Sequence, residues 1–232
     1  MKASSKFIAV EGLDGAGKST QIALLTEYLA SRNEKTKFVH FPRSNQGVFG
    51  ELIAKFLRGE FGEVKNVHPQ LVALLFAEDR KEFASTIYQW LEEGYFVLVD
   101  RYVLSNIAFQ CAKLSAATEK QYLRNWILDF EYHYNKIPKP DFSIYLDVPF
   151  SFVEAALDKR RANENRDYLQ GKDDIHEKDY TLQQAVKKEY DALLEADNSI
   201  NRIDCFNEAQ QMRSVADIHA EIVQLVNSRM VL

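Results

Sequence analysis

A glycine-rich loop between an apolar run and a helix-like segment limits most strongly how this chain can fold. The loop, residues 12–19, reads GLDGAGKS and directly follows the apolar residues 7–10. It matches the Walker A pattern in its expected context of strand, turn and helix. Backbone N–H groups of such a loop point at phosphates, Lys18 adds a positive charge, and the Ser19 hydroxyl suits magnesium. The motif predicts a site for a nucleoside triphosphate.

Five apolar runs are predicted as buried strands, and long helical patterns separate them. The runs cover residues 7–10, 37–41, 95–99, 142–146 and 200–203. Helices are expected over residues 69–90 and, at the end of the chain, over 210–226. This alternation predicts an α/β fold with a parallel, doubly wound sheet, whose ligands bind at the carboxyl ends of the strands.

Composition favours a soluble intracellular protein of one domain, residues 1–232. Hydrophobic residues make up 46% and charged residues 27%, and no apolar stretch approaches the ~20 residues of a membrane span. The N-terminus shows no signal peptide, so we expect a cytoplasmic location and no membrane partner. The net charge of -5 without a basic run argues against a nucleic-acid partner. Cys111 and Cys205 lack metal spacing and are expected as reduced core residues.

Charged residues follow three of the predicted strands. Glu11 follows the first, Arg43 the second, and Asp100 and Arg101 the third, so we expect them at one edge of the sheet. Asp100 is suited to magnesium, and Arg101 to a phosphate that its guanidinium can bind with two nitrogens. An Asp–Arg surface pair is the alternative for these two. For Glu11 a structural hydrogen bond and a catalytic role both stay open.

The pattern of residues 69–90 predicts an amphipathic helix. Phe76 and Arg80 are four residues apart and share a face of it. Taken alone, Phe76 is better explained as a core residue, because aromatic residues at helical spacing usually pack. The apolar positions that define the pattern are Leu71, Leu74, Leu75, Ala77 and Phe83.

Residues 159–178 are dense in charge and have no apolar stripe between Ala162 and Ile175. We expect a mobile lid there rather than a core element. The alternative is a charged segment that is simply exposed to solvent.

Five segments, in order, resemble the thymidylate kinase family. They are EGLDGAGKST at 11–20, FPR at 41–43, LFAEDR at 75–80, DRY with SNIAF at 100–102 and 105–109, and PKPD at 138–141. The likeness runs across nearly the whole chain. It implies a P-loop NTPase fold with a five-stranded parallel sheet flanked by helices and a mobile charged lid. It also implies a homodimer and transfer of the γ-phosphoryl group of Mg-ATP to dTMP, giving dTDP and ADP.

The resemblance also implies roles for individual residues. Phe76 would stack on thymine, Arg80 and Asn106 would contact the base, and Phe109 would lie against the sugar where a 2′-hydroxyl would sit. Arg43 and Arg101 would hold the monophosphate. The implied substrate-binding set is completed by Ser105 and Glu177. The implied ATP-binding residues are Gly12, Leu13, Asp14, Gly15, Ala16, Gly17, Lys18, Ser19 and Thr20. The phosphate-loop pattern itself predicts Ser19, Asp14 and Asp100 as magnesium ligands, and an Asp14 that merely faces water is the alternative for that residue. The expected catalytic residues are Lys18, Asp14 and Arg101, together with Arg160 and Arg166, which the resemblance implies.

Two departures from the family pattern leave substrate contacts open. His176 stands where an aromatic residue is usual, and Ser44 stands where a tyrosine often follows the FPR motif. Two other functions are alternatives for this sequence. A deoxynucleoside kinase would need a general base, for which Glu11 is available, but it would have no use for both Arg43 and Arg101. A regulator that holds ATP without transferring phosphate would lack an acceptor site.

Overall fold

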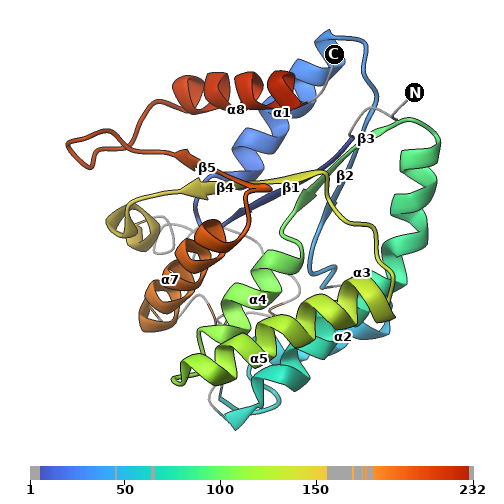
Figure 1. Cartoon of the computed structure of the whole chain (residues 1–232), viewed down its shortest axis with the longest axis vertical. Helices are drawn as coiled ribbons and strands as arrows, with labels where there is room; N and C mark the ends of the chain where they lie inside the picture. The colour runs from blue at the N-terminus through green and yellow to red at the C-terminus, as the bar shows by residue number, and fades with distance from the viewer. Residues whose placement is uncertain are drawn as a thin grey trace.

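Five parallel strands form one sheet in the computed structural model of this chain. The structure describes residues 6–44, 46–63, 66–155, 169, 174, 176 and 180–229. In sheet order the strands are β2 (Thr36–His40), β3 (Phe96–Asp100), β1 (Phe7–Gly12), β4 (Phe142–Asp147) and β5 (Ile200–Asp204). Each overlaps a run that the sequence predicts as a strand, which confirms the predicted sheet (Figure 1).

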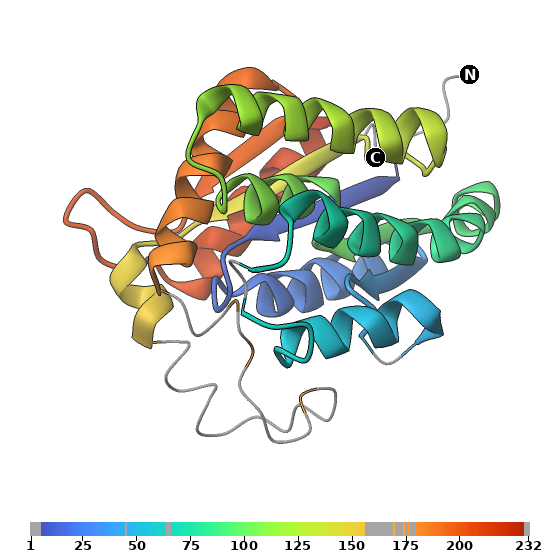
Figure 2. The same ribbon diagram turned by 90° about the horizontal axis from the view of Figure 1, so that it is seen from below.

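Helices cover both faces of the sheet. Helices α1 and α8 pack together on one face, and α3, α4 and α7 lie on the other, with α5 against α4 and α2 against α3 (Figures 1 and 2). Their bounds are α1 (Lys18–Ser31), α2 (Gly47–Leu57), α3 (Pro69–Glu92), α4 (Val103–Cys111), α5 (Ala117–Leu128) with the π-helical turn η2 (Asp129–Tyr134), α7 (Tyr180–Ala196) and α8 (Val215–Arg229).

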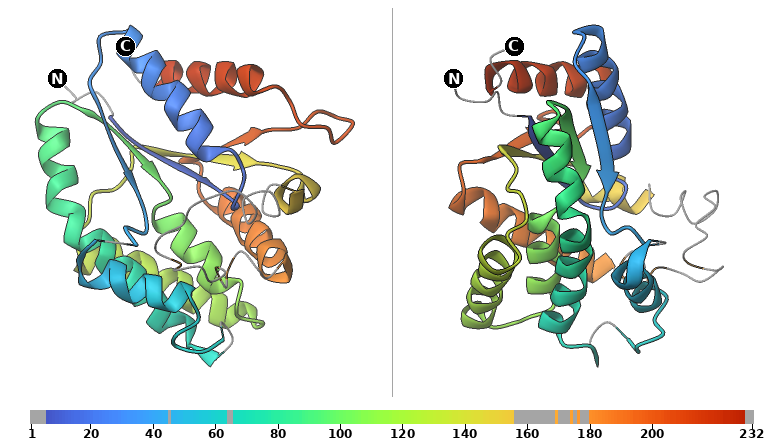
Figure 3. Two further views of the ribbon diagram at one scale, coloured as in Figure 1. Left: turned by 180° about the vertical axis from the view of Figure 1, so that it is seen from behind. Right: turned by 90° about the vertical axis from the view of Figure 1, so that its right-hand side faces the viewer.

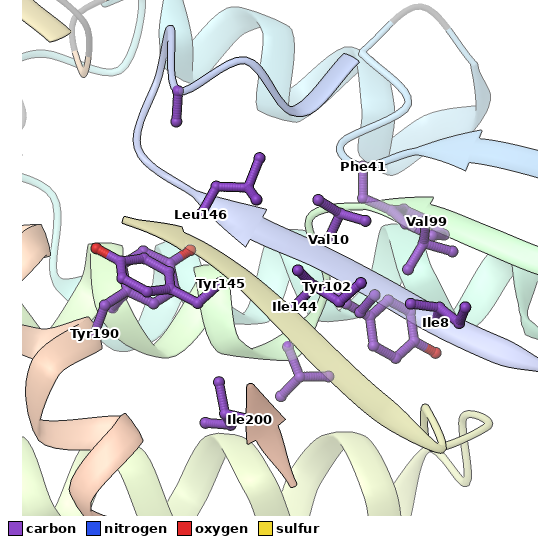
Figure 4. Close-up of a cluster of buried hydrophobic side chains, with 14 of the residues drawn as sticks. Ile8, Val10, Phe41, Val99, Tyr102, Ile144, Tyr145, Leu146, Tyr190 and Ile200 are labelled. Carbon is purple, nitrogen blue, oxygen red and sulfur yellow. The ribbon is translucent and has the colours of Figure 1, made fainter. Parts of the chain in front are cut away.

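The burial of the sheet explains why its central strands are so apolar. Every residue of β1, β3 and β4 is buried, as a parallel sheet covered on both faces requires. Figure 4 shows side chains of these strands, among them Ile8, Val99 and Ile144, packed in one core. Cys111 and Cys205 are free and buried, which confirms the expectation of reduced core cysteines. Within the described residues, no helix is long and apolar enough to cross a membrane.

The strand order brings three strand ends to one edge of the sheet. Asp100 at the end of β3 is in register with Val10 of β1 on one side and with His40 of β2 on the other. The segments that follow these strands therefore start side by side, as the views of the sheet from behind and from the side also show (Figure 3). This arrangement confirms the prediction that the charged strand ends meet.

One predicted helix boundary is wrong. The last helix begins at Val215 rather than at residue 210, because the chain before it forms a turn in which Phe206 bridges Met212. The helix over residues 69–90 is confirmed as α3, but Leu71 is 60% exposed. The buried face of α3 instead includes two charged residues, Asp79 and Arg80, whose partners come from other elements.

Candidate active site

The glycine-rich loop folds into a turn that ends at the N-terminus of α1. Gly15 and Gly17 have φ angles of 76° and 84°, in the left-handed region that residues with a Cβ rarely adopt. Helix α1 begins directly afterwards, at Lys18. The first backbone N–H groups of a helix lack intrahelical acceptors, and with the helix dipole they favour a bound anion. The loop has the backbone shape that its sequence predicts.

Lys18 lies over this loop rather than in solvent. Its Nζ donates to the backbone oxygens of Leu13 at 2.9 Å and Gly12 at 3.3 Å, and only 7% of the residue is exposed. Burial, together with the positive charge of Arg101, lowers the pKa of Lys18 to about 8. A phosphate oxygen would be a stronger acceptor for this ammonium group than the two carbonyl oxygens.

Asp100 is buried between two nitrogen groups at the end of β3. Its Oδ1 is 3.9 Å from Lys18 Nζ, and its Oδ2 is 3.3 Å from His40 Nδ1. Burial by itself would raise the pKa of Asp100, but Lys18 and His40 outweigh burial and hold that pKa below its ordinary value. Among the described residues Oδ1 has no hydrogen-bond partner. A charged oxygen without a donor is therefore available at the phosphate loop.

Arg101 links the end of β3 to the glycine-rich loop. Its backbone has a φ of 66°, an uncommon conformation for a residue with a side chain. Its Nη2 donates to Asp14 Oδ1 at 2.7 Å, and Gln183 Nε2 of α7 donates to Asp14 Oδ2 at 3.0 Å. Both carboxylate oxygens of Asp14 thus accept a hydrogen bond. The magnesium role suggested for Asp14 stays a prediction.

Arg43, at the end of β2, is held against α3. Its Nε donates to Asp79 Oδ1 at 3.0 Å and its Nη2 to Glu82 Oε2 at 3.1 Å, while its backbone N–H donates to Asp79 Oδ2 at 2.9 Å. Helix α2 passes so close that a Cβ on Gly50 would lie 2.2 Å from the backbone oxygen of Arg43. These contacts fix the Arg43 guanidinium at the same sheet edge as the phosphate loop.

Arg80 and Asn106 are brought together by a buried carboxylate that the sequence did not predict. Arg80 Nε and Nη2 each donate to Glu131 at 2.6 Å, and the two residues are 2% and 0% exposed. Burial would lower the pKa of Arg80, but Glu131 keeps that pKa above its ordinary value. Asn106 Nδ2 donates to Glu131 Oε1 and to the backbone oxygen of Ala73, each at 3.0 Å. Asn106 Oδ1 is buried without a hydrogen-bond partner in the described part of the chain.

Aromatic rings lie between these polar groups. Phe109 stacks on His176 with ring centroids 5.4 Å apart, and the Arg101 guanidinium lies 5.0 Å from the centre of the Phe109 ring. His176 also contacts Phe56 edge to face, and burial lowers the pKa of its imidazole well below the ordinary value, so it is neutral at pH 7. Phe76 is half-buried and packs against a small apolar cluster of α2 and α3. His176 thus remains an aromatic neighbour of the site despite the departure from the family pattern.

The other predicted residues fall into two groups. Ser19 and Thr20 are exposed in the first turn of α1, and Ser105 is buried on α4 beside Arg101. Most of the predicted lid, residues 159–178, lies outside the described residues, and so do Arg160, Arg166 and Glu177.

The sequence missed the residues that hold the predicted ones in place. Asp79 precedes Arg80 in the LFAEDR segment, and this adjacency could have drawn attention to it. Glu131 and Gln183 lie in helical stretches without a motif. Their partners are 51 and 169 residues away in the chain, so no local pattern signals them.

Comparisons with known proteins agree on one kind of enzyme. The family model described as thymidylate kinase matches residues 10–216. A thymidylate kinase of Plasmodium falciparum is 32% identical over 97% of this chain and 91% of its own length. The thymidylate kinase of Schizosaccharomyces pombe is 28% identical over 96% and 92%. The solved structure of thymidylate kinase from Candida albicans covers 98% of this chain and 93% of its own, with a TM-score of 0.71 and 26% identity.

Proposed function

This chain belongs to the thymidylate kinase family, and from that premise we propose how it transfers the γ-phosphoryl group of ATP to dTMP, giving ADP and dTDP. The observation that carries the proposal is a second polar site beside the phosphate loop. Arg43 and Arg101 follow neighbouring strands, and the buried Arg80–Glu131–Asn106 group joins α3, η2 and α4. A loop for one phosphate chain, and beside it a set of cationic and amide side chains that can bind a second phosphate and a base, suit two nucleotides.

The acceptor chemistry needs few groups from the protein. The second pKa of a phosphate monoester is ~6, so the acceptor is mostly a dianion at neutral pH and needs no general base. Catalysis then depends on positioning and on neutralising charge around the transferred group. Lys18 would contact the donor phosphates. Arg101 would turn one guanidinium edge from Asp14 to the acceptor phosphate, which offers a bidentate partner of higher charge.

We propose that the buried Arg80–Glu131–Asn106 group recognises the thymine base. With two of its nitrogens on Glu131, the Arg80 guanidinium is fixed and can donate from its remaining N–H groups. The unpartnered Asn106 Oδ1 is an acceptor for a base N–H. A thymine ring offers both a carbonyl oxygen and an N–H at one edge, which matches this pair.

A magnesium ion fits the unpartnered oxygen of Asp100. We assign the ion to this carboxylate and to the Ser19 hydroxyl, both at the phosphate loop; when bound, it would neutralise charge on the donor phosphates. The described residues contain no group of three His, Cys, Asp or Glu that could hold a metal by themselves. Mg²⁺ in phosphoryl-transfer sites takes most of its ligands from water and from substrate phosphates.

A panel of acceptors tests the function. Release of ADP is measured in a coupled assay with ATP and dTMP, dUMP, dGMP, UMP or thymidine. We expect dTMP to be a good acceptor and UMP a poor one, because Phe109 would occupy the space of a 2′-hydroxyl. Turnover of thymidine in place of dTMP would assign the chain to the deoxynucleoside kinases, and ATP binding without any transfer would favour a regulator.

Replacing Phe76 with alanine tests the stacking role. We expect the KM for dTMP to rise by about 5- to 150-fold with little change in the KM for ATP, because stacking on a base is worth ~1–3 kcal/mol. The matched control is Tyr88→Ala on the same helix, where the hydroxyl donates to the backbone oxygen of Lys136 at 3.0 Å and no selective change in the KM for dTMP is expected. If Phe76→Ala instead raised the KM for dTMP and for ATP equally, Phe76 would be a residue of the apolar core without a stacking role.

The proposal extends to the domain organisation, cellular location and oligomeric state of the protein. Residues 1–232 are proposed to act as one cytoplasmic kinase domain without nucleic-acid or membrane partners, and as a homodimer. The dimer contact is assigned to residues 71–83 and 107–126, where Leu71 and Tyr122 are 60% and 63% exposed. Sedimentation equilibrium of the wild type and of Tyr122→Glu tests this, since a charge at a self-associating face should shift the protein to monomer.

A further inference from the structure

Three buried oxygens form a triangle next to Arg101. Ser105 Oγ donates to Glu11 Oε2 at 2.5 Å, Tyr190 OH donates to the same oxygen at 2.9 Å, and the two hydroxyl oxygens are 2.7 Å apart. The three residues come from α4, β1 and α7 and are 7%, 0% and 1% exposed. Burial and the nearby Glu11 raise the pKa of the Tyr190 hydroxyl well above its ordinary value, so it is a donor at neutral pH.

This triangle holds both the backbone and the side chain at Arg101. Glu11 Oε1 accepts the backbone N–H of Tyr102 at 2.9 Å, directly after the left-handed Arg101. Ser105 Oγ accepts a hydrogen bond from Arg101 Nη1 at 3.0 Å. A non-glycine residue with positive φ persists only where its surroundings hold it. The triangle supplies such contacts from three elements.

The two terminal nitrogens of Arg101 therefore have different partners. Nη1 is bonded to the buried Ser105, whereas Nη2 is bonded to Asp14 of the glycine-rich loop. Asp14 is 17% exposed at its side chain, so the Nη2 edge is the one that an entering phosphate can reach. We propose that Tyr190 is a positioning residue, whose hydroxyl keeps Ser105 and Glu11 in place so that Nη1 stays anchored while Nη2 turns to the acceptor phosphate.

The neighbouring Tyr145 offers a control that distinguishes the role of the Tyr190 hydroxyl from that of the Tyr190 ring. The two rings stack at 4.6 Å with an angle of 27° between their planes (Figure 4). Both residues are fully buried, but among the described residues the Tyr145 hydroxyl has no hydrogen-bond partner. Removing one hydroxyl or the other leaves both rings in the stack. Of these two hydroxyls, the one on Tyr190 is connected to Arg101, through Ser105.

The test compares Tyr190→Phe with Tyr145→Phe and uses thymidine as a ligand without phosphate. The inference rests on the proposed phosphate role of Arg101. We expect Tyr190→Phe to lower kcat/KM for dTMP about tenfold, because a hydrogen bond to a charged group is lost. The inhibition constant of thymidine should stay unchanged, since thymidine does not use Arg101. Tyr145→Phe should change neither value.

Three results would overturn the inference. They are an unchanged kcat/KM in Tyr190→Phe, an equal loss for dTMP and thymidine, and the same loss in Tyr145→Phe. If Tyr190→Phe does not fold, Glu11→Gln takes its place and must show the same loss for dTMP alone. A wild-type protein without activity on dTMP would instead remove the proposed function, so the two failures are distinguishable.

Discussion

Replacing Lys18 with alanine is expected to lower kcat by about 10²- to 10³-fold, because a buried cation at the transferred phosphoryl group stabilises charge that develops in the transition state. The fold should remain intact. Among the described residues, the ion pair of Lys18 with Asp100 at 3.9 Å has no closer rival, and Lys18 donates hydrogen bonds to two backbone oxygens of its own loop. Steady-state kinetics with saturating ATP and dTMP, alongside a thermal melt, measure both effects.

Lys6→Ala is the matched control for this variant. Lys6 lies before β1, at the end of the strand opposite the glycine-rich loop, and its Nζ donates to the backbone oxygen of Gly94 at 2.8 Å. The Lys6→Ala variant loses one lysine next to the same strand but keeps the loop unchanged, so its kcat should equal that of the wild type. Near-normal turnover of Lys18→Ala would contradict the catalytic role of Lys18. An equal fall in both variants would point to a general loss of folded protein.

The sheet could be predicted because its information is local. Each strand is an apolar run of a few residues, and the rule that parallel strands expose ligands at their carboxyl ends places Arg43, Asp100 and Arg101 together. The helix boundaries do not follow from local sequence in the same way. Residues 205–213 have no strong turn signal, and the start of α8 depends on the tertiary contact between Phe206 and Met212.

The polar partners in the site could not be predicted in the same way. The sequence places Arg80 and Asn106 in the site only through resemblance, and it gives no reason to pair either with Glu131. That pairing depends on how α3, α4 and η2 pack against one another. Likewise, α7 contacts the glycine-rich loop through Gln183, and it contacts Glu11 through Tyr190. Gln183 and Tyr190 are seven residues apart on this helix. Both positions look like ordinary helical residues until the helix is placed.

The buried pair of Arg80 and Glu131 leads to the largest expected change in stability. Glu131→Ala leaves the Arg80 guanidinium buried at 2% exposure without its carboxylate, and breaking a buried pair on one side costs about 3–5 kcal/mol. Asn106 loses an acceptor in the same change. For a chain of this size, each kcal/mol shifts the Tm by about 2–4 °C, so a fall of roughly 10 °C is expected. Urea unfolding measures the free energy directly.

Asp129→Ala provides the comparison within the same π-helical turn. Asp129 pairs with His133, but their side chains are 76% and 81% exposed, and surface pairs contribute less than about 1 kcal/mol. Its urea midpoint should therefore stay close to that of the wild type while the midpoint of Glu131→Ala falls. Equal, small effects in both variants would mean that Arg80 finds water or another acceptor when Glu131 is removed. In that case the guanidinium would not be fixed for base recognition, and the role proposed for Glu131 would fail along with the stability prediction.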